Sequence, residues 1–390
     1  MKNKGVLIRV ATSSMALNVL LKNQLKYMSR YFDVIAVGGG KDGLMEVRKR
    51  ENVSVIDVPM TRSITPFRDL ISLCRLIIIC FVNRPIIIHS HTPKAGLLSM
   101  IAGWITLVPI RIHTVAGLPL VETRNIKRKI LLLVERITYL LSTDVYCVST
   151  KLMKLIIRLK LISSDKISVI NKGSSNGIDE TYFLEDVERI MDSFGMKNGF
   201  KEDDFILTYV GRLVEDKGVN ELILAFKEIS RCNKSIKLLL LGSFEETLCP
   251  LSSFSIQEIK TNSGIVCTGF VDDIRPYLRM TKVFVFPTYR EGFPNSLLQA
   301  ALMGIPCITT NINGCNEIIL NDYNGIIIPK KNMVCLLNAI EILFKNQKVY
   351  LKYKKNAEEY SNVILNDFSQ RNFHDSLLKE YEHKLKSLEE

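Results

Sequence analysis

Residues 283 to 310 read Val283-Phe-Val-Phe-Pro-Thr-Tyr-Arg-Glu291-Gly-Phe-Pro-Asn-Ser-Leu-Leu-Gln299-Ala-Ala-Leu-Met-Gly304-Ile-Pro306-Cys-Ile-Thr-Thr310, and they decide the fold of this chain. The apolar, β-prone run Val283 to Pro287 predicts a buried parallel strand that ends in a loop. A second strand is predicted at Cys307 to Thr310, with a helix between the two. Strand, loop, helix and strand in this order indicate an α/β fold built on parallel sheets.

The helix between these strands has start and stop signals. We expect Asn295 or Ser296 to cap its start. Gly304 closes its end, and Pro306 stops it. Its first backbone amides face the crevice above the sheet, where hydrogen bonds and the helix dipole favour an anion. Glu291 stands beside this crevice, and because a carboxylate repels a diphosphate, sugar hydroxyls suit it better. An ordinary βαβ unit with a surface glutamate is the alternative.

The length of 390 residues predicts two domains. We expect an N-terminal Rossmann-like domain over 1–176 and a C-terminal one over 177–366. A closing helix over 367–390 is expected to pack back on the first domain. The boundary lies in the polar, glycine-rich segment Asn171 to Asp179.

The charge is concentrated in the first half of the chain. Residues 1 to 180 carry 27 Lys and Arg against 12 Asp and Glu, a net +15, and the remaining residues carry 25 against 28, a net −3. The basic half favours an anionic partner, which is nucleic acid, an anionic membrane or a phosphate-bearing substrate. A merely basic surface is the alternative.

Nine cysteines are scattered without a CxxC spacing. This pattern is typical of thiols in a reducing cytoplasm and not of a disulfide framework or a zinc site. The apolar run before Arg9 is too short for a signal peptide, so we expect no export.

The first strand is predicted at Val6 to Val10, and one amphipathic helix is predicted in the segment Thr12 to Met28. Ser13 and Ser14 lie at the start of this helix. They either cap it or bind an acceptor phosphate.

Gly38-Gly-Gly40-Lys-Asp-Gly43 matches the GxGxxG pattern of dinucleotide-binding proteins. Such a site requires a packed helix directly after it, but residues 44–52 contain only three apolar side chains. We therefore predict a glycine-rich turn. A nucleotide-dependent oxidoreductase remains an alternative function.

Phe67 to Val82 is strongly apolar but contains Arg68, Asp69 and Arg75, so its uninterrupted part is too short to span a bilayer. A core-packed helix is the first interpretation, and a helix lying in the membrane surface is the second. Basic and apolar residues also mix at 127–129 and 151–160. The three stretches together favour binding to a membrane surface.

Histidines accompany two further strands. His89 and His91 alternate along a predicted strand and can share a face, but no third ligand has a recognisable spacing, so we expect no metal site. The strand Ile110 to Thr114 brings His113 to a loop that contains Gly117. This arrangement suits a binding crevice, although a lone histidine is more often structural.

A second α/β set begins at the strand Phe205 to Val210, followed by Gly211-Arg-Leu-Val-Glu-Asp-Lys217-Gly218 and a helix over Val219 to Ile229. Arg212 and Lys217 lie at the carboxyl end of this strand. Two cations there clamp a diphosphate or are simply solvated. Further strands are predicted at 237–241 and 265–270, and the last helix at Asp367 to Lys386.

With these motifs the whole chain resembles the retaining GT-B glycosyltransferases of family 4. Residues 291 to 299 resemble the signature loop of the family's nucleotide-sugar domain. Three stretches are similar to enzymes that extend lipid-linked O-antigen, capsule or N-glycan precursors with hexosamines: His89-Ser-His-Thr-Pro-Lys-Ala-Gly96, Ile112-His-Thr-Val-Ala-Gly-Leu-Pro-Leu120 and Gly173-Ser-Ser-Asn-Gly-Ile-Asp179. The resemblance implies two Rossmann-like domains that face each other across a cleft.

The resemblance also implies roles for individual residues. Arg212 and Lys217 would neutralise the leaving diphosphate. Glu291 would hold donor-sugar hydroxyls, and His113 would touch the donor sugar near the reacting carbon. The other implied donor-binding positions are Gly211, Gly242, Phe270, Val271, Gly292, Phe293, Pro294, Asn295, Ser296 and Gln299. The implied acceptor-binding positions are Ser13, Ser14, His91, Lys94 and Gly117.

Two positions depart from the family pattern. Gln299 stands where the family has a second glutamate that binds both ribose hydroxyls. Because an amide both accepts from and donates to a diol, we expect weaker but retained binding. Thr12-Ser13-Ser14 replaces the usual double glycine after the first strand, a change that we relate to the acceptor.

The resemblance predicts transfer of a sugar, an N-acetylhexosamine, from a UDP donor to an undecaprenyl-diphosphate-linked saccharide, with retained configuration. The expected partners are the UDP-sugar, the lipid-linked acceptor and the inner face of the cell membrane, bound through the basic N-terminal domain. The cationic clamp takes the place of a metal, so we expect no cofactor. Domain closure about residues 171–179 would exclude water.

A basic nucleic-acid-binding protein is the other alternative. Its charges would be expected beside exposed aromatic residues, but here they alternate with apolar helix faces. We therefore predict no nucleic-acid partner.

Overall fold

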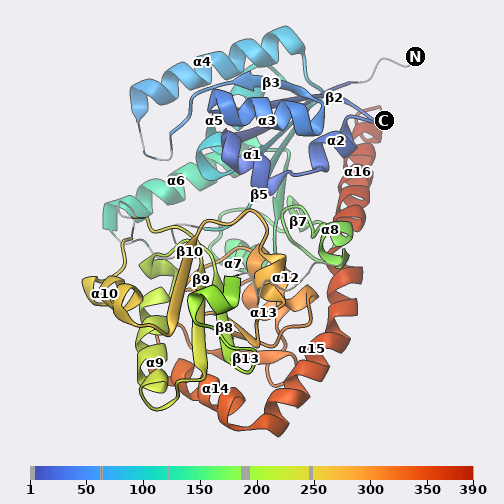
Figure 1. Ribbon diagram of the computed structural model, residues 1–390. Coiled ribbons are helices and arrows are strands. Elements are labelled where there is room, and N and C mark those ends of the chain that lie inside the picture. The colour runs from blue at the N-terminus through green and yellow to red at the C-terminus, as the bar shows by residue number, and fades with distance from the viewer. Residues whose placement is uncertain are drawn as a thin grey trace. The chain divides into compact units, whose positions relative to one another are not determined.

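The computed structural model describes residues 5–61, 63, 65–118, 120, 123, 125–185, 194–245 and 249–389. The chain divides into two compact units (Figure 1). Unit 1 comprises Met1–Gly177 and Gln370–Glu390, and unit 2 comprises Ile178–Ser369. The chain therefore leaves unit 1 after Gly177 and returns to it at Gln370.

Unit 1 is built on a seven-stranded parallel sheet with the order β3-β2-β1-β4-β5-β6-β7. Its strands are β1 (Val6–Ser13), β2 (Asp33–Gly39), β3 (Ser54–Asp57), β4 (Ile87–His91), β5 (Ile110–Val115), β6 (Asp144–Cys147) and β7 (Ile167–Val169). Every residue of β4 and nearly every residue of β1 and β5 is buried. Such strands are typical of a parallel sheet that is covered on both faces.

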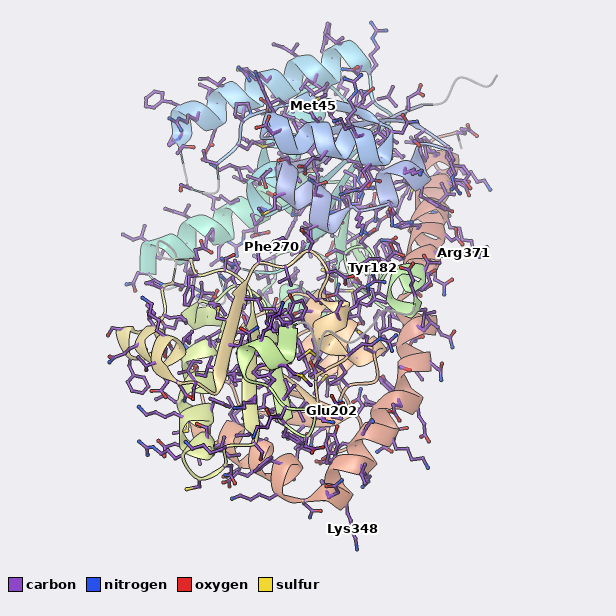
Figure 2. The ribbon with its side chains drawn as sticks, in the orientation of Figure 1. Met45, Tyr182, Glu202, Phe270, Lys348 and Arg371 are labelled. Carbon is purple, nitrogen blue, oxygen red and sulfur yellow. The ribbon has the colours of Figure 1, made fainter. Side chains whose placement is uncertain are left out.

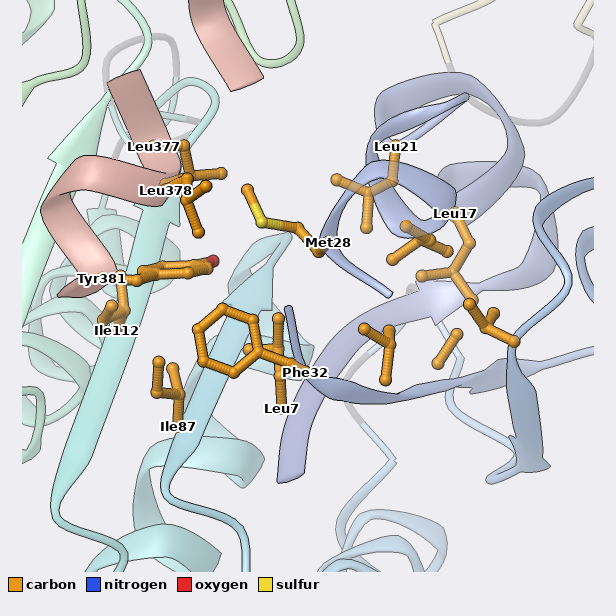
Figure 3. Packing of buried hydrophobic residues seen from close by; sticks show 14 of the residues in the cluster. Leu7, Leu17, Leu21, Met28, Phe32, Ile87, Ile112, Leu377, Leu378 and Tyr381 are labelled. Carbon is orange, nitrogen blue, oxygen red and sulfur yellow. The ribbon is translucent and has the colours of Figure 1, made fainter. Parts of the chain in front are cut away.

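Helices cover both faces of this sheet. They are α1 (Ser14–Leu20), α2 (Gln24–Met28), α3 (Lys41–Glu51), α4 (Pro66–Asn83), α5 (Pro93–Ile105), α6 (Asn125–Leu141), α7 (Thr150–Arg158) and α16 (Gln370–Lys386). Alternate residues of β1 serve the two faces: Leu7 packs with residues of α1, α2 and α16, and Ile8 packs with residues of α4 and α5. Figure 3 shows the first of these clusters, with Phe32, Leu377 and Tyr381 near Leu7.

The prediction of a single helix in the segment Thr12 to Met28 is wrong. β1 continues to Ser13, and two short helices follow, because Asn23 between them takes a left-handed φ of 65°. Asparagine tolerates this conformation better than most residues. Ser13 Oγ accepts a hydrogen bond from the amide of Ala16 at 3.3 Å, so its predicted capping role is confirmed.

The prediction of a glycine-rich turn at Gly38 to Gly43 is also wrong, because α3 begins at Lys41. Leu44 and Val47 of α3 are buried one turn apart. This narrow apolar face is enough to pack α3. Because polar residues surround it in the sequence, the apolar periodicity of a helix is weak here.

Unit 2 is built on a six-stranded parallel sheet with the order β10-β9-β8-β11-β12-β13. Its strands are β8 (Phe205–Val210), β9 (Ile236–Leu241), β10 (Ile265–Gly269), β11 (Val283–Phe286), β12 (Cys307–Thr310) and β13 (Gly325–Ile328). Its helices are α8 (Glu180–Leu184), α9 (Val219–Cys232), α10 (Ser253–Thr261), α11 (Arg275–Leu278), α12 (Asn295–Leu302), α13 (Cys315–Ile318), α14 (Met333–Lys345) and α15 (Gln347–Phe368), with short 3-10 helices at Met196–Asn198 and Glu215–Lys217. The predicted class, two Rossmann-like parallel sheets, is confirmed.

The stretch quoted first forms β11, α12 and β12, as predicted. Gly304 takes a φ of 67° directly after the C-cap residue Met303. The predicted N-cap is wrong: Pro294 holds the cap position without a side-chain hydrogen bond, and Asn295 and Ser296 are the first helical residues. The start of α12 is therefore uncapped.

The helix predicted over Asp367 to Lys386 is interrupted at Ser369, where extended backbone separates α15 from α16. Phe373, Leu377 and Tyr381 of α16 belong to the core of unit 1. The last helix thus contributes to the first sheet although it is distant in the sequence.

Candidate active site

The strand order of unit 2 reverses between β8 and β11. In doubly wound sheets, ligands bind at such a point, beyond the carboxyl ends of the strands. Gly218 follows β8 with a φ of 70°, and a Cβ there would overlap the carbonyl oxygen of Pro287, which follows β11. This close approach requires glycine. It brings the loop that carries Arg212 and Lys217 against the loop that carries Glu291.

Lys217 and Glu291 form an ion pair between these two loops. Thr288 Oγ1 donates a second hydrogen bond to the same Glu291 Oε1 atom at 3.2 Å. The two charged side chains are only 18% and 15% exposed. The residue predicted to bind phosphate is therefore joined to the residue predicted to bind sugar, and a ligand has to exchange partners with this pair.

Arg212 lies in the same loop as Lys217 but faces another carboxylate. Its Nη1 atom pairs with Glu245, and 46% of its side chain is exposed. Arg290 pairs with Asp216 at 2.8 Å. Neither Glu245 nor Asp216 was predicted as a site residue, although each follows the carboxyl end of a predicted strand by a few residues, as Lys217 does.

The backbone that leads into α12 is closely packed. A Cβ at Gly314 would lie 2.5 Å from the carbonyl oxygen of Gly292. The side chain of Phe293 is buried in the core of unit 2, and Pro294 is also buried. Because no side chain caps α12, its first-turn amides, which include those of Asn295 and Ser296, can donate to a ligand.

Gln299 lies on α12 at the position where the resemblance implies a second glutamate. The side chain is half-buried and makes no hydrogen bond to any residue of the described ranges. Its amide can therefore both accept from and donate to a ligand diol.

The predicted nucleobase site lies at the ends of β9 and β10. A Cβ at Gly242 would overlap the carbonyl oxygen of Gly211, and the amide of Gly242 donates to the Gly269 carbonyl at 2.8 Å. Phe270 is 76% exposed (Figure 2), whereas Val271 packs against an apolar cluster of unit 2. An exposed ring beside glycine backbone suits stacking against a planar base.

His113 lies in β5 of unit 1 and is only 2% exposed. Ser90 Oγ donates to the carbonyl oxygen of Ile112 at 3.3 Å, so it accepts the proton of His113 Nδ1 at 2.9 Å. This arrangement leaves His113 Nε2 without a proton, as an acceptor. Burial lowers the pKa of His113 to about 4, which keeps the ring neutral.

Helices α5 and α6 hold the ring of His113 in place. A Cβ at Gly96 of α5 would lie 2.5 Å from His113 Cε1, so a larger residue has no room. The ring of Tyr139, from α6, lies 6.3 Å from the His113 ring. Glu135, one turn earlier on α6, is buried, and burial raises its pKa to about 7. No role could be predicted for Ser90, Gly96, Tyr139 or Glu135, because only their packing around His113 distinguishes them.

Most predicted acceptor-binding side chains have partners within unit 1. Ser13 caps α1, His91 Nε2 bonds the guanidinium of Arg9 at 2.7 Å, and Lys94 pairs with Asp69 at 2.6 Å. Ser14 starts α1 beside the glycines at 40 and 43, and Gly117 lies in the loop after β5. The side chains of Lys94 and Asp69 are 13% and 20% exposed, so both are partly accessible to a ligand.

The ends of β1 and β4 meet where the order of the first sheet reverses. The hydroxyls of Thr12 and Thr92 lie 2.6 Å apart at this point. The structure therefore brings together the two segments that carry Ser13 and His91, as the predicted acceptor site requires.

His89 and His91 share a face, as predicted, and their rings stack with centroids 4.6 Å apart. Both nitrogens of His89 bond protein groups, the hydroxyls of Tyr381 and Thr114. In the part of the chain that the structure describes, no three His, Cys, Asp or Glu side chains gather as a candidate metal centre.

Helix α4 has two different faces. Ser72, Leu76, Ile79 and Cys80 are buried. The opposite face exposes a row of large apolar side chains: Phe67, Leu70, Ile71, Ile78, Phe81 and Val82. The core-packed interpretation therefore accounts for one face only. None of the helices in the described ranges has the length and apolar character needed to cross a membrane.

Known protein families match both halves of the chain. Residues 192–360 match the family described as glycosyl transferases group 1, and residues 19–180 match the one described as Glycosyltransferase Family 4. The capsular polysaccharide biosynthesis glycosyltransferase CapM of Staphylococcus aureus is 35% identical over 350 residues, which cover 90% of each chain.

A second relative and a solved structure agree with these matches. The UDP-Gal:alpha-D-GlcNAc-diphosphoundecaprenol alpha-1,3-galactosyltransferase of Escherichia coli is 29% identical over 328 residues, covering 82% of this chain and 81% of its own. The structure of Anabaena HepE in complex with UDP-glucose superposes with a TM-score of 0.79 at 15% identity, covering 97% of this chain and 100% of its own. The last similarity concerns the fold.

Proposed function

The chain belongs to the group 1 glycosyltransferases, and on this basis we propose its reaction: transfer of a sugar, an N-acetylhexosamine, from a UDP donor to an undecaprenyl-diphosphate-linked saccharide, with retention of configuration. The product is the lipid-linked saccharide extended by one sugar, a step in the synthesis of a capsule, an O-antigen or a related glycan. The names of CapM and of the E. coli relative support the polysaccharide, the UDP donor and the lipid-linked acceptor.

One observation carries this proposal. Lys217 and Glu291 meet at the reversal point of the second sheet, beside the uncapped start of α12. An ammonium attracts a phosphate, a carboxylate accepts hydrogen bonds from hydroxyls, and helix-start amides donate to anions. The site thus suits a ligand that carries a phosphate and a sugar together.

Donor binding exchanges the partners of these charges. The diphosphate takes Lys217 from Glu291 and Arg212 from Glu245, and the carboxylate of Glu291 turns to sugar hydroxyls. Gln299 bonds the ribose diol. His113, through Nε2, accepts a hydrogen bond from a substrate hydroxyl.

The transfer itself needs no covalent link to the protein. The bond between the sugar C1 and the phosphate oxygen breaks, while the acceptor hydroxyl forms its bond to C1 from the same face. The hydroxyl proton passes to the leaving phosphate. Arg212 and Lys217 stabilise the negative charge that grows on this phosphate, and this role requires no metal.

Incubation with a panel of UDP-sugars and a synthetic polyprenyl-diphosphate saccharide tests the proposal. We expect one UDP-sugar to give a product whose mass has increased by one sugar, and an N-acetylhexosamine in particular. Turnover should persist in EDTA, and its complete loss would contradict the metal-free mechanism. A panel without any transfer would contradict the donor class.

The two alternative functions are not favoured. The family models that match the two halves of the chain describe glycosyltransferases and not an oxidoreductase. The positive charge of the first half does not require a nucleic-acid partner, because a lipid diphosphate and an anionic membrane are both negatively charged.

We also propose that the enzyme acts on the inner face of the cell membrane. The exposed apolar row on α4 is supported by charge, because Arg68 and Arg75 flank it and the first 180 residues carry a net +15. A helix of this kind lies in the membrane surface, with arginines at the head groups. The basic segments 127–129 and 151–160 add positive charge to the same unit, although the side chain of Lys127 lies outside the described residues.

Flotation with vesicles that contain anionic lipid tests this membrane role. The variant Phe67→Ser/Phe81→Ser should lose flotation and keep its turnover of a short, water-soluble acceptor. Val334→Ser/Leu351→Ser is the matched control, because it removes two exposed apolar side chains from unit 2. Equal flotation of all three proteins would contradict docking through α4.

A further inference from the structure

Arg9 is fully buried in the middle of β1. Its Nη1 atom donates to the hydroxyl of Tyr381 at 3.2 Å. Its Nη2 atom donates to Gln24 Oε1 and to His91 Nε2, the latter at 2.7 Å. Figure 3 shows Tyr381 extending from α16 into this region of unit 1, near Phe32.

No carboxylate within the described ranges pairs with this guanidinium. Its neighbours are neutral: burial lowers the pKa of His89 and of His91, and burial raises the pKa of Tyr381 to about 12. An isolated buried charge is unfavourable unless an opposite charge compensates it. The cluster therefore lacks a counter-charge.

Two hydrogen-bond donors in the cluster also lack an acceptor. Among the residues that the structure describes, Arg9 Nε has no partner, and neither has His91 Nδ1. Because His91 Nε2 accepts from Arg9, the proton of the neutral ring sits on Nδ1, and this atom is a donor. Both orphaned atoms thus require an acceptor, and buried donors of this kind rarely stay unsatisfied.

A small cavity lies beside these groups. Its lining includes Arg9, Gln24, His91, Thr114 and Ser174. Its volume of about 10 Å³ holds one particle of the size of a water molecule and excludes a phosphate or a carboxylate. The possible ligands are therefore water and a single small ion.

Three side-chain acceptors around the cavity are already used, whereas the hydroxyl of Tyr146, which also lines the cavity, has no partner in the described ranges. Gln24 Oε1 accepts from Arg9, Thr114 Oγ1 bonds His89, and Ser174 Oγ accepts from the amides of Asn176 and Gly177 at 3.4 and 3.1 Å. A water molecule can bond these donors and the Tyr146 hydroxyl, but it leaves the charge of Arg9 uncompensated. A halide ion only accepts hydrogen bonds, and it supplies the negative counter-charge that Arg9 lacks.

We propose that the cavity is a binding site for one small monovalent anion, chloride, held by the guanidinium of Arg9 and the imidazole of His91. Because Tyr381 bonds both Arg9 and His89, the anion also stabilises the attachment of α16 to the sheet of unit 1. This inference does not depend on the proposed glycosyl transfer.

Thermal unfolding of the full chain in sodium chloride and in sodium gluconate, at equal ionic strength, tests the site. Gluconate is too large for the cavity, so chloride should raise the Tm of the wild type by roughly 2–4 °C. Arg9→Met should abolish the difference, and Arg48→Met, which removes an exposed arginine of α3, should keep it. Equal Tm values for the wild type in the two salts would overturn the proposal.

Bromide provides a direct test on the wild type, which is decisive even if Arg9→Met does not fold. Crystals grown in sodium bromide should show an anomalous scattering peak within hydrogen-bond reach of the Arg9 guanidinium. A peak there supports the anion site. Density for water without anomalous signal overturns it.

Discussion

The candidate site residues of the two units differ in how they are held. In unit 2, Lys217 and Glu291 are charged and paired with each other across two loops. In unit 1, His113 is neutral, buried and fixed by Ser90 and Gly96. A ligand can exchange partners with an ion pair, whereas packing has already set the geometry of the His113 ring.

The two units also differ in where their charged residues lie. The first 180 residues carry a net +15, but His113 and its neighbours are uncharged, whereas the half with a net −3 holds the cationic loop. Net charge therefore indicates which partner a surface attracts and does not locate the chemistry. Each of the following variants tests one side of this contrast.

The largest effect is expected at the exchangeable pair. Lys217→Ala removes the positive charge that we propose faces the leaving phosphate, and it breaks the ion pair with Glu291. A group of this kind contributes about 10²- to 10³-fold to kcat. Initial rates with the UDP-sugar should therefore fall by this factor.

Lys227→Ala is the matched control for this variant. Lys227 of α9 also pairs with a glutamate of unit 2, Glu258 of α10, at 2.9 Å, and this pair does not involve the loops after β8 and β11. Its turnover should stay near that of the wild type. If Lys217→Ala kept native rates, the role of the pair in catalysis would be lost.

The second effect concerns pH and the neutral side of the comparison. Burial lowers the pKa of His113 from 6.5 to about 4. Between these values the unfolded chain takes up a proton that the folded chain refuses, so the free energy of unfolding falls as the pH is lowered through this window. The loss is about 3 kcal/mol and is complete below pH 4. His89 and His91 add slopes of the same sign.

Glu135 opposes this slope. Burial raises its pKa from 4.5 to about 7, so the unfolded chain ionises first and stability falls as the pH rises between these values. Glu135→Gln should remove the opposing contribution, stabilise the protein at pH 7 by up to about 3 kcal/mol and steepen its acid-side loss. Urea unfolding from about pH 4 to about pH 7.5, which covers both pKa windows, measures the free energy of unfolding of the wild type and of Glu135→Gln. If the two proteins showed the same dependence of this free energy on pH, Glu135 would not be a buried neutral acid.

Five of the six strands of unit 2 could be predicted because each is a short, continuous, β-prone apolar run, whereas β13 (Gly325–Ile328) was not predicted. The predicted bounds of Phe205 to Val210 and Cys307 to Thr310 coincide with β8 and β12. Helix α3 could not be predicted from the same signal, because only Leu44 and Val47 form its apolar face. Local patterns thus predict elements with a wide buried face better than elements with a narrow one.

Contacts that depend on strand order could not be read from the chain. The sequence places Lys217 and Glu291 after different strands, 74 residues apart, and only the pairing of β8 with β11 brings them together. In the same way, the neighbours β4 and β5 bring Ser90 to His113. The roles of these residues in donor and acceptor binding stay predictions.

The third prediction disturbs the fixed geometry of unit 1. Gly96→Ala places a methyl group where it would lie 2.5 Å from His113 Cε1, so the ring must move. Overpacking of this kind costs about 1–3 kcal/mol of stability. A displaced substrate-contacting group lowers kcat by roughly 10- to 100-fold.

Gly103→Ala separates the displacement of His113 from overpacking in general. Gly103 lies on the same helix, and its new methyl group would meet Ile88 and Arg111 at 3.1 and 3.2 Å. It should lower the Tm and keep kcat. Equal kcat values for the two variants would show that the ring of His113 is not held in place for activity.

The smallest effect is expected at the exposed pair of unit 2. Glu245→Ala releases Arg212, which then binds the donor phosphate without first breaking an ion pair. Because an exposed pair contributes about 0–1 kcal/mol, the Kd for UDP should decrease by at most about fivefold. Glu341→Ala, which breaks the exposed pair with Lys345 on α14, should leave the Kd unchanged in the same calorimetric titration. A weaker binding of UDP after Glu245→Ala would mean that Glu245 positions Arg212 instead of competing for it, and the exchange of partners would then be confined to Lys217 and Glu291.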